Sequence, residues 1–168
     1  NFYEMIEEQA RLCLLNIREK DIVFTVRFLD RFPQQVSGDS IRVAQIFQNI
    51  LSNACKFTEQ GTITLSLHCK MEEGQVWFDG CVEDTGVGMT KEKLAQVFTE
   101  YVSFSEDMGV EGFGLGLSIV RQLVEMMHGW VRAESDPGKG TRVSFGFYQK
   151  QVMAEISEPR NIGREKLK

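Results

Sequence analysis

Apolar residues recur at helical spacing in three long segments of the chain. This spacing predicts helices over residues 1–19, about 40–57 and 115–127. Asp39 or Ser40 can cap the second helix, and Gly129 is a usual residue at a helix C-terminus. The stripe expected to face the core from the second helix consists of Val43, Ile46, Phe47, Ile50, Leu51 and Ala54.

Other segments alternate apolar and polar residues, as half-buried strands do. The alternation predicts strands over residues 22–28, 62–70, 76–83, 130–135 and 141–148. Turns at 72–74 and 136–140 join the last four into two hairpins. Hairpins combined with long helices predict an α+β two-layer sandwich, with a mixed, mostly antiparallel sheet and helices on one face.

Between these segments, Thr90 is expected to cap a further helix, and residues 102–113 read as an acidic, glycine-bearing loop. The side chains expected to face inward from that helix are Leu94, Val97, Phe98 and Tyr101. Apolar periodicity fades after residue 148. We therefore expect one domain over residues 1–148 and a linker or C-terminal tail over residues 149–168.

Composition narrows the class of protein. The chain has 168 residues, 42% of them hydrophobic and 26% charged, as in an ordinary soluble domain. A net charge of −5 does not indicate a nucleic-acid partner, and no apolar run is long enough to span a bilayer. The first residue is Asn1 rather than an initiator Met, which suggests a piece of a longer protein.

Cysteine and histidine give no sign of a metal centre. The four cysteines form no CxxC pair, so we expect buried or incidental thiols in a reducing compartment. His68 and His128 have no partners at metal-ligand spacing and are expected to be ordinary surface or edge residues.

The first candidate functional group is Asn49, Asn53 and Lys56. Their spacing places all three on one side of the second helix. An amide oxygen is a hard ligand suited to Mg²⁺, and a Lys ammonium stabilises phosphate charge. Taken alone, the same pattern also fits a solvated polar helix face.

The second group is the segment Asp84–Met89, which directly follows a predicted strand. Gly86 and Gly88 permit a close approach of a flat ring to the backbone, and Asp84 can accept a hydrogen bond from the amine of adenine. A plain Asp-x-Gly turn remains an equal alternative for this segment alone.

The third group, Gly112, Gly114 and Gly116, precedes a predicted helix, whose N-terminal N–H groups can hold phosphates. The GxGxG spacing is not that of a dinucleotide-binding fingerprint. Residues 138–141 likewise fail the pattern of a P-loop, since a Gly stands where Ser or Thr is required.

In this order, the motifs resemble those of the ATP-binding catalytic domain of sensor histidine kinases, within the superfamily shared with gyrase B, MutL and heat-shock chaperone ATPases. The resemblance covers about residues 1–148. Its segments are 38–58, similar to the N box; 84–89, 112–117 and 138–141, similar to three glycine boxes; and 97–101, similar to the phenylalanine box, with Tyr101 where Phe is usual.

The resemblance implies a Bergerat-type ATP-binding fold with a left-handed βαβ unit that binds Mg²⁺ and ATP. It implies that Asp84 contacts adenine with support from Thr141, that Asn53 and nearby Asn49 hold the metal, and that Lys56 meets the phosphates. Residues 102–113 would form a lid, although this segment lacks Lys and Arg. The other residues expected to contact the nucleotide are Gly86, Gly88, Met89, Phe98, Tyr101, Gly112, Gly114, Leu115 and Gly116.

Asn49 also indicates the reaction. Gyrase-like ATPases place a Glu four residues before the metal-binding Asn to activate water, and an Asn cannot act as a general base. We therefore expect phosphoryl transfer rather than hydrolysis, with Asn49, Asn53 and Lys56 as the catalytic group.

The resemblance also suggests partners. The acceptor histidine is expected on a dimerisation domain outside this chain, and a receiver domain or response regulator is a further expected partner. The domain is expected to be cytoplasmic and to touch no membrane, within a parent that can be a membrane-anchored sensor. A serine kinase of the same fold and a nucleotide-binding interaction domain with little transfer activity remain alternatives.

Overall fold

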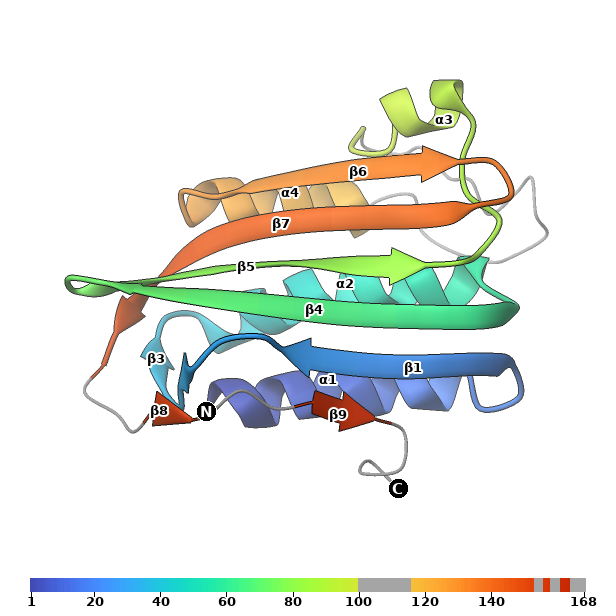
Figure 1. The fold of residues 1–168 in the computed structure, drawn as a ribbon. Helices are drawn as coiled ribbons and strands as arrows, with labels where there is room; N and C mark the ends of the chain where they lie inside the picture. The colour runs from blue at the N-terminus through green and yellow to red at the C-terminus, as the bar shows by residue number, and fades with distance from the viewer. Residues whose placement is uncertain (100–115, 153–155, 158–160, 164–168) are drawn as a thin grey trace.

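The computed structural model describes residues 1–99, 116–152, 156–157 and 161–163 (Figure 1). Its helices are α1 (Phe2–Asn16), α2 (Ser40–Phe57), α3 (Lys91–Ala95) and α4 (Gly116–Met126). Its strands are β1 (Asp21–Phe28), β2 (Phe32–Pro33), β3 (Val36–Ser37), β4 (Gln60–Glu72), β5 (Gln75–Asp84), β6 (Trp130–Asp136), β7 (Gly140–Gln151), β8 (Ile156–Ser157) and β9 (Asn161–Gly163).

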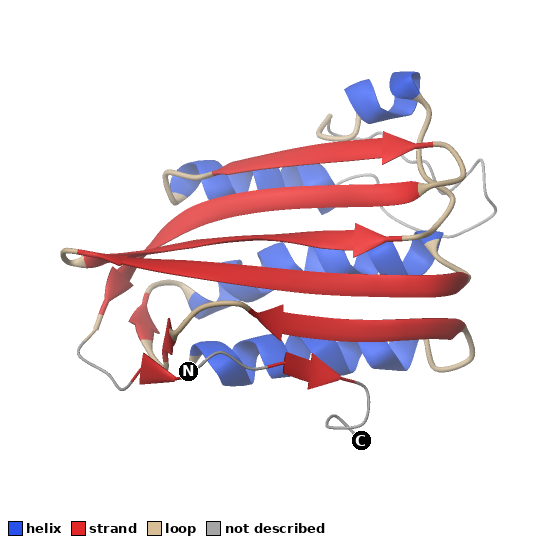
Figure 2. Cartoon of the chain, in the orientation of Figure 1, coloured by secondary structure: helices blue, strands red, loops and turns tan. Residues whose placement is uncertain are grey.

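One sheet runs through the molecule in the order β3-β7-β5-β4-β1-β9, with β6 also paired to β7. Among the described strands, β1 and β4 form its one parallel pair, and the α2 helix connects them. The other pairs in this sheet are antiparallel. The helices α1, α2 and α4 cover one face (Figure 2), so the predicted two-layer α+β sandwich is confirmed.

The alternation of burial along β1 shows which side chains of this strand face the helices. Phe24 and Val26 are 1% and 0% exposed, whereas Val23 between Ile22 and Phe24 is 62% exposed. The inward side chains pack against the apolar stripe of α2, which is buried as predicted. Burial of each such side chain contributes about 1.5–3 kcal/mol, so the two patterns together hold the sheet against the helices.

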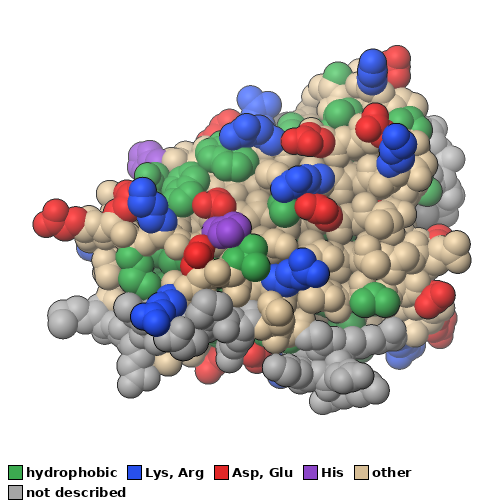
Figure 3. All heavy atoms as spheres, in the orientation of Figure 1, with side chains coloured by type: hydrophobic (Ala, Val, Ile, Leu, Met, Phe, Trp, Pro, Cys, Tyr) green, Lys and Arg blue, Asp and Glu red, His purple; other side chains and the backbone are tan. Residues whose placement is uncertain are grey.

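The opposite face of the sheet is open to solvent and carries interspersed charges of both signs (Figure 3). Aromatic side chains cover part of it. Trp77 lies between the buried Val76 and Phe78 and therefore points outward, where its ring meets Tyr148 edge-on at a centroid distance of 4.6 Å. Gly146 leaves room for this ring, because a Cβ there would lie 2.3 Å from the Trp77 side chain.

Both ends of α2 are capped. The Asp39 carboxylate accepts hydrogen bonds from the N–H groups of Ile41 and Arg42 at 3.1 and 3.2 Å. At the other end, the Lys20 ammonium donates to the carbonyl oxygens of Cys55 and Thr58 at 2.8 and 3.1 Å. These contacts satisfy terminal backbone groups and hold the helix that carries Asn53.

The helix predicted after Thr90 is shorter than the pattern suggested. Thr90 caps it as expected, but α3 has only five residues, none of them buried. Leu94 is half-buried within it, while Val97 and Phe98 follow it and are half-buried against the core. Tyr101 lies outside the described residues.

Part of the segment expected to be a linker or tail belongs to the sheet. β7 continues to Gln151, and β9 pairs with β1 through the register Val26–Ile162. Ile162 is 4% exposed and covers the edge of β1, which would otherwise present unpaired backbone groups. A three-residue strand is too short to show periodicity. The domain boundary after residue 148 stays a prediction.

The cysteines and histidines lie where the sequence suggested. All four thiols are free, and three of them, those of Cys13, Cys55 and Cys81, are buried. His68 and His128 are exposed. Within the described part of the chain, no helix has the length and hydropathy needed to cross a membrane.

Candidate nucleotide-binding site

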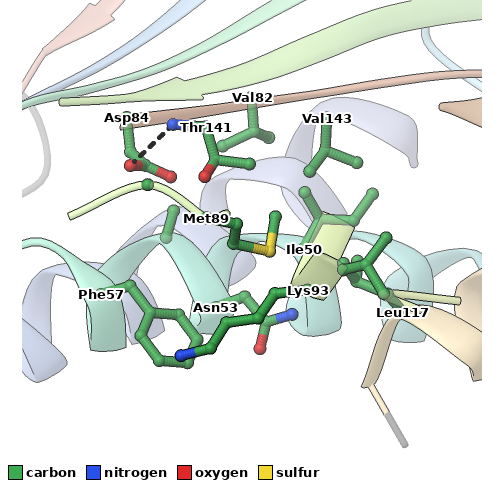
Figure 4. Close-up of a pocket in the computed structure, with 13 residues that line it drawn as sticks. Ile50, Asn53, Phe57, Val82, Asp84, Met89, Lys93, Leu117, Thr141 and Val143 are labelled. Carbon is green, nitrogen blue, oxygen red and sulfur yellow. Dashed lines mark hydrogen bonds between the residues drawn. The ribbon is translucent and has the colours of Figure 1, made fainter. Parts of the chain in front are cut away.

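A pocket opens between the ends of β5 and β7 on one side and α2, α3 and α4 on the other (Figure 4). Among the described residues, its walls are mostly apolar, with one carboxylate and few other polar groups. The lining residues are Ile50, Asn53, Ala54, Phe57, Val82, Asp84, Gly88, Met89, Lys93, Val97, Leu117, Thr141 and Val143. Apolar walls with a few placed polar groups are typical of a site for a flat organic ligand.

Asp84 is the last residue of β5, and its carboxylate points into the pocket. Its Oδ1 atom accepts hydrogen bonds from the backbone N–H groups of Gly86 at 2.9 Å and Thr141 at 3.3 Å. Burial raises the pKa of this carboxyl, and these two bonds partly oppose the rise. The predicted support of Asp84 by Thr141 is present through the backbone N–H group of Thr141.

The loop after Asp84 packs too tightly for side chains at its glycines. A Cβ on Gly86 would lie 2.1 Å from the carbonyl oxygen of Phe57, and one on Gly88 would lie 2.0 Å from that of Asp136. Gly88 also has a φ of +66°, which an L side chain rarely adopts. The two glycines therefore let the loop lie directly against α2 and the β6–β7 turn.

Asn53 enters the pocket from α2, opposite the first residue of α4. A Cβ built on Gly116 would lie 3.7 Å from its amide oxygen. Asn49, one turn earlier, is not among the lining residues, and its Nδ2 atom is buried without a hydrogen-bond partner. Lys56 is half-buried and does not line the pocket either. The metal and catalytic roles of these residues stay predictions.

The structure thus brings several predicted residues together and separates others. The predicted residues that line the pocket are Asn53, Asp84, Gly88, Met89 and Thr141, with Gly86 and Gly116 beside it. Phe98 packs against the core but is not among the lining residues. The remaining predicted residues, Tyr101, Gly112, Gly114 and Leu115, lie outside the described residues.

Sequence reasoning missed Lys93 and Ser135. Lys93 lines the pocket, and in Figure 4 its side chain extends past Asn53 toward Phe57. Lys93 could have been found from its position next to Leu94, one of the side chains expected to face inward from this helix. Ser135 bonds to the backbone N–H of Met89 at 2.8 Å. A serine at a strand end carries no periodic signal, so only the fold reveals this contact.

The residues present fit a magnesium nucleotide. A base can lie between the apolar walls with its amine toward Asp84, and the amide oxygen of Asn53 is a donor of the kind that Mg²⁺ accepts. The site therefore belongs to an α+β nucleotide-binding domain.

Comparisons with known proteins agree with this class. The family described as histidine kinase-, DNA gyrase B- and HSP90-like ATPases matches residues 38–151. The adaptive-response sensory kinase SasA of Thermosynechococcus vestitus is 36% identical over 144 residues, which are 84% of this chain and 37% of that protein. The aerobic respiration control sensor ArcB of Escherichia coli K12 is 30% identical over 94% of this chain and 20% of its own length.

Solved structures are similar over most of the chain. Full-length ShkA in complex with AMPPNP has a TM-score of 0.73 and 29% identity, covering 90% of this chain and 31% of that one. A nucleotide-free catalytic domain of the histidine kinase ThkA has a TM-score of 0.66 and 25% identity, covering 88% and 91%.

The chain therefore belongs to the family of histidine kinase-, DNA gyrase B- and HSP90-like ATPases. Within that family, its sequence and fold are those of the ATP-binding catalytic domain of a sensor histidine kinase. It spans about a third or less of the two curated relatives named above.

Proposed function

We propose that this domain binds Mg²⁺ and ATP and donates the γ-phosphoryl group to a histidine on a separate dimerisation domain. The observation that carries the proposal is the pocket itself, where Asp84, Gly88 and Asn53 meet between apolar walls. Asp84 selects the base, and the backbone bonds from Gly86 and Thr141 hold its carboxylate in place.

At the other end of the pocket, the amide oxygen of Asn53 would hold Mg²⁺, which neutralises phosphate charge. Lys93 adds a cation at the pocket, and Lys56 lies one turn beyond Asn53 on α2. Such sites act by positioning and electrostatics rather than by covalent chemistry.

Transfer is favoured over hydrolysis because of Asn49. Gyrase-like ATPases use a Glu at this position to take a proton from water, and an amide cannot accept one. Neither His68 nor His128 is among the residues that line the pocket. His68 faces Asp30 at 3.0 Å, and His128 lines a different hollow with Ser37 and Asp39. We therefore propose that the acceptor lies on another domain.

The proposed partners are the dimerisation domain of the same parent protein and a receiver domain or response regulator. The proposed location is the cytoplasm, where ATP is available. The relatives SasA and ArcB extend well beyond the matched region, which is consistent with further domains in the parent.

The experiment uses ATP labelled at the γ-phosphate. We expect the isolated chain to bind Mg²⁺ and ATP, to form no acid-labile phosphohistidine, and to phosphorylate the added dimerisation domain of its parent. Absence of ATP binding at millimolar concentration would contradict the proposal, as would phosphohistidine on the chain itself. Acid-stable phosphoserine on an added protein would instead indicate a serine kinase.

A further inference from the structure

The hydroxyl of Ser135, on β6, has three hydrogen-bond partners around the pocket. It accepts from the backbone N–H of Met89 at 2.8 Å and donates to the carbonyl oxygen of Gly140 at 2.8 Å. It also lies 2.9 Å from the hydroxyl oxygen of Thr141. One side chain therefore connects the loop after β5 with the start of β7.

These partners determine the direction of each hydrogen bond. A hydroxyl carries one proton and two lone pairs. The carbonyl oxygen of Gly140 can only accept, so it takes the Ser135 proton, and the N–H of Met89 can only donate, so it takes one lone pair. The contact with Thr141 uses the remaining lone pair, and Thr141 must be its donor.

The direction of that bond changes what Thr141 offers to a ligand. Because its proton is committed to Ser135, the Thr141 hydroxyl presents only lone pairs to the pocket. Its neighbour Asp84 is also an acceptor. In Figure 4 the Thr141 hydroxyl and the Asp84 carboxylate point to the same side, into the pocket.

We propose that Ser135 is a positioning residue that determines base specificity by orienting the hydroxyl of Thr141. This inference rests on the proposed function as an ATP-binding domain. Two adjacent acceptors suit the amine at C6 of adenine, which has two protons to donate. A base with a carbonyl oxygen at C6, such as hypoxanthine, would place an acceptor rather than an amine against these two acceptors.

The test compares the affinities of Mg²⁺-ATP and Mg²⁺-ITP, measured by calorimetry at pH 8. Hypoxanthine, the base of ITP, has a carbonyl oxygen at C6 and a proton on N1, and it lacks the 2-amino group of guanine. We expect the wild-type chain to prefer ATP and Ser135→Ala to lose about tenfold of that preference, the size of one hydrogen bond. In this variant the freed Thr141 proton can bond to the carbonyl oxygen of ITP. Ser135→Thr retains a hydroxyl and should restore the preference.

The possible outcomes distinguish a role of Ser135 in base specificity from a purely structural role. If Ser135→Ala weakens both nucleotides by the same factor, the residue is merely structural and the inference is overturned. If the wild-type chain binds neither nucleotide, the proposed function fails and the inference fails with it. An unchanged ATP preference in a variant that still binds ATP overturns the inference alone.

A second variant covers the case in which Ser135→Ala folds poorly. Thr141→Val keeps the shape of the side chain and the backbone bond to Asp84 but removes the hydroxyl. It should lower the ATP preference by itself, and an unchanged preference would overturn the proposal even where Ser135→Ala folds poorly. Where Ser135→Ala folds, adding it to Thr141→Val should change the preference no further. If Ser135→Ala lowers the preference by the same factor with Val at position 141, Ser135 acts by another route and the proposal is wrong.

Discussion

The backbone N–H of Val87 donates to the carbonyl oxygen of Phe57 at 3.1 Å. This bond fastens the loop that follows Asp84 to the last residue of α2, the helix that carries Asn53. The carbonyl oxygen of Val87 in turn accepts from the N–H of Gly138 at 2.7 Å. The loop is thus held on both sides, and its position relative to α2 and the β6–β7 turn is determined by backbone groups.

Gly88→Ala should disrupt this arrangement. The added Cβ would lie 2.0 Å from the carbonyl oxygen of Asp136, and the loop must shift to relieve the clash. Gly138→Ala is a matched control, because Gly138 has a similar φ of +77° but nothing within 4 Å of its Cβ position. We expect the control to lose about 1–2 kcal/mol of unfolding free energy from backbone strain alone. Gly88→Ala should lose more and also fail to bind ATP in calorimetry. Equal effects of the two substitutions would contradict the tight packing at Gly88.

Asp84→Asn should separate stability from function. Burial raises the pKa of Asp84 above its ordinary value of 3.8, so the folded protein holds this proton more tightly than the unfolded chain. Its contribution to the free energy of unfolding therefore falls as the pH rises from 3.8 through the folded pKa. An Asn carries no charge to bury, and its amide oxygen can keep the bonds from Gly86 and Thr141.

We expect Asp84→Asn to equal or exceed the wild type in stability at neutral pH, as measured by urea denaturation, and to lose ATP binding. In the wild type, ATP affinity should weaken as the pH falls through the raised pKa, because a protonated carboxyl is a poorer acceptor. An ATP affinity in Asp84→Asn equal to that of the wild type would exclude the assigned role of Asp84.

Local patterns predicted much of this fold. The residues Ile22–Phe28 and the stripe from Val43 to Ala54 each belong to one element with one buried face. Such a pattern of apolar residues is visible in the sequence alone. β9 could not be predicted in this way, because Asn161–Gly163 is too short for a period and forms only by pairing with β1.

The site could be predicted only in part, because some of its contacts join segments that are far apart in the sequence. Helical spacing placed Asn49 and Asn53 on one side of α2, yet one turn of helix separates them, and only Asn53 lines the pocket. Ser135 contacts Met89, which is 46 residues away along the chain. No pattern within a single segment can reveal a contact of that kind, since it arises only when the loop and β6 are folded together.

Lys20→Met should destabilise the C-terminal end of α2. The substitution leaves the carbonyl oxygens of Cys55 and Thr58 without their donor and removes a cation from the negative end of the helix dipole. We expect a loss of about 1–3 kcal/mol in unfolding free energy. Lys20 also pairs with Glu59 at 3.0 Å, but that Glu side chain is 76% exposed. Glu59→Gln should therefore cost less than about 1 kcal/mol, and equal losses in the two variants would show that the ion pair rather than the cap matters.

Asn53→Ala should remove the dependence of nucleotide binding on magnesium. In the wild type, ATP affinity should fall when EDTA replaces Mg²⁺, because Asn53 would hold the metal and the metal would neutralise phosphate charge. Asn53→Ala should bind ATP equally weakly with and without the metal. Asn49→Ala on the same helix compares the two predicted ligands, since Asn49 does not line the pocket. Its buried Nδ2 has no hydrogen-bond partner, so its removal should cost little stability, and the loss of magnesium dependence should be smaller than in Asn53→Ala. If Asn49→Ala loses that dependence as fully as Asn53→Ala, both amides ligate the metal, and the helix must turn Asn49 toward the nucleotide when it binds.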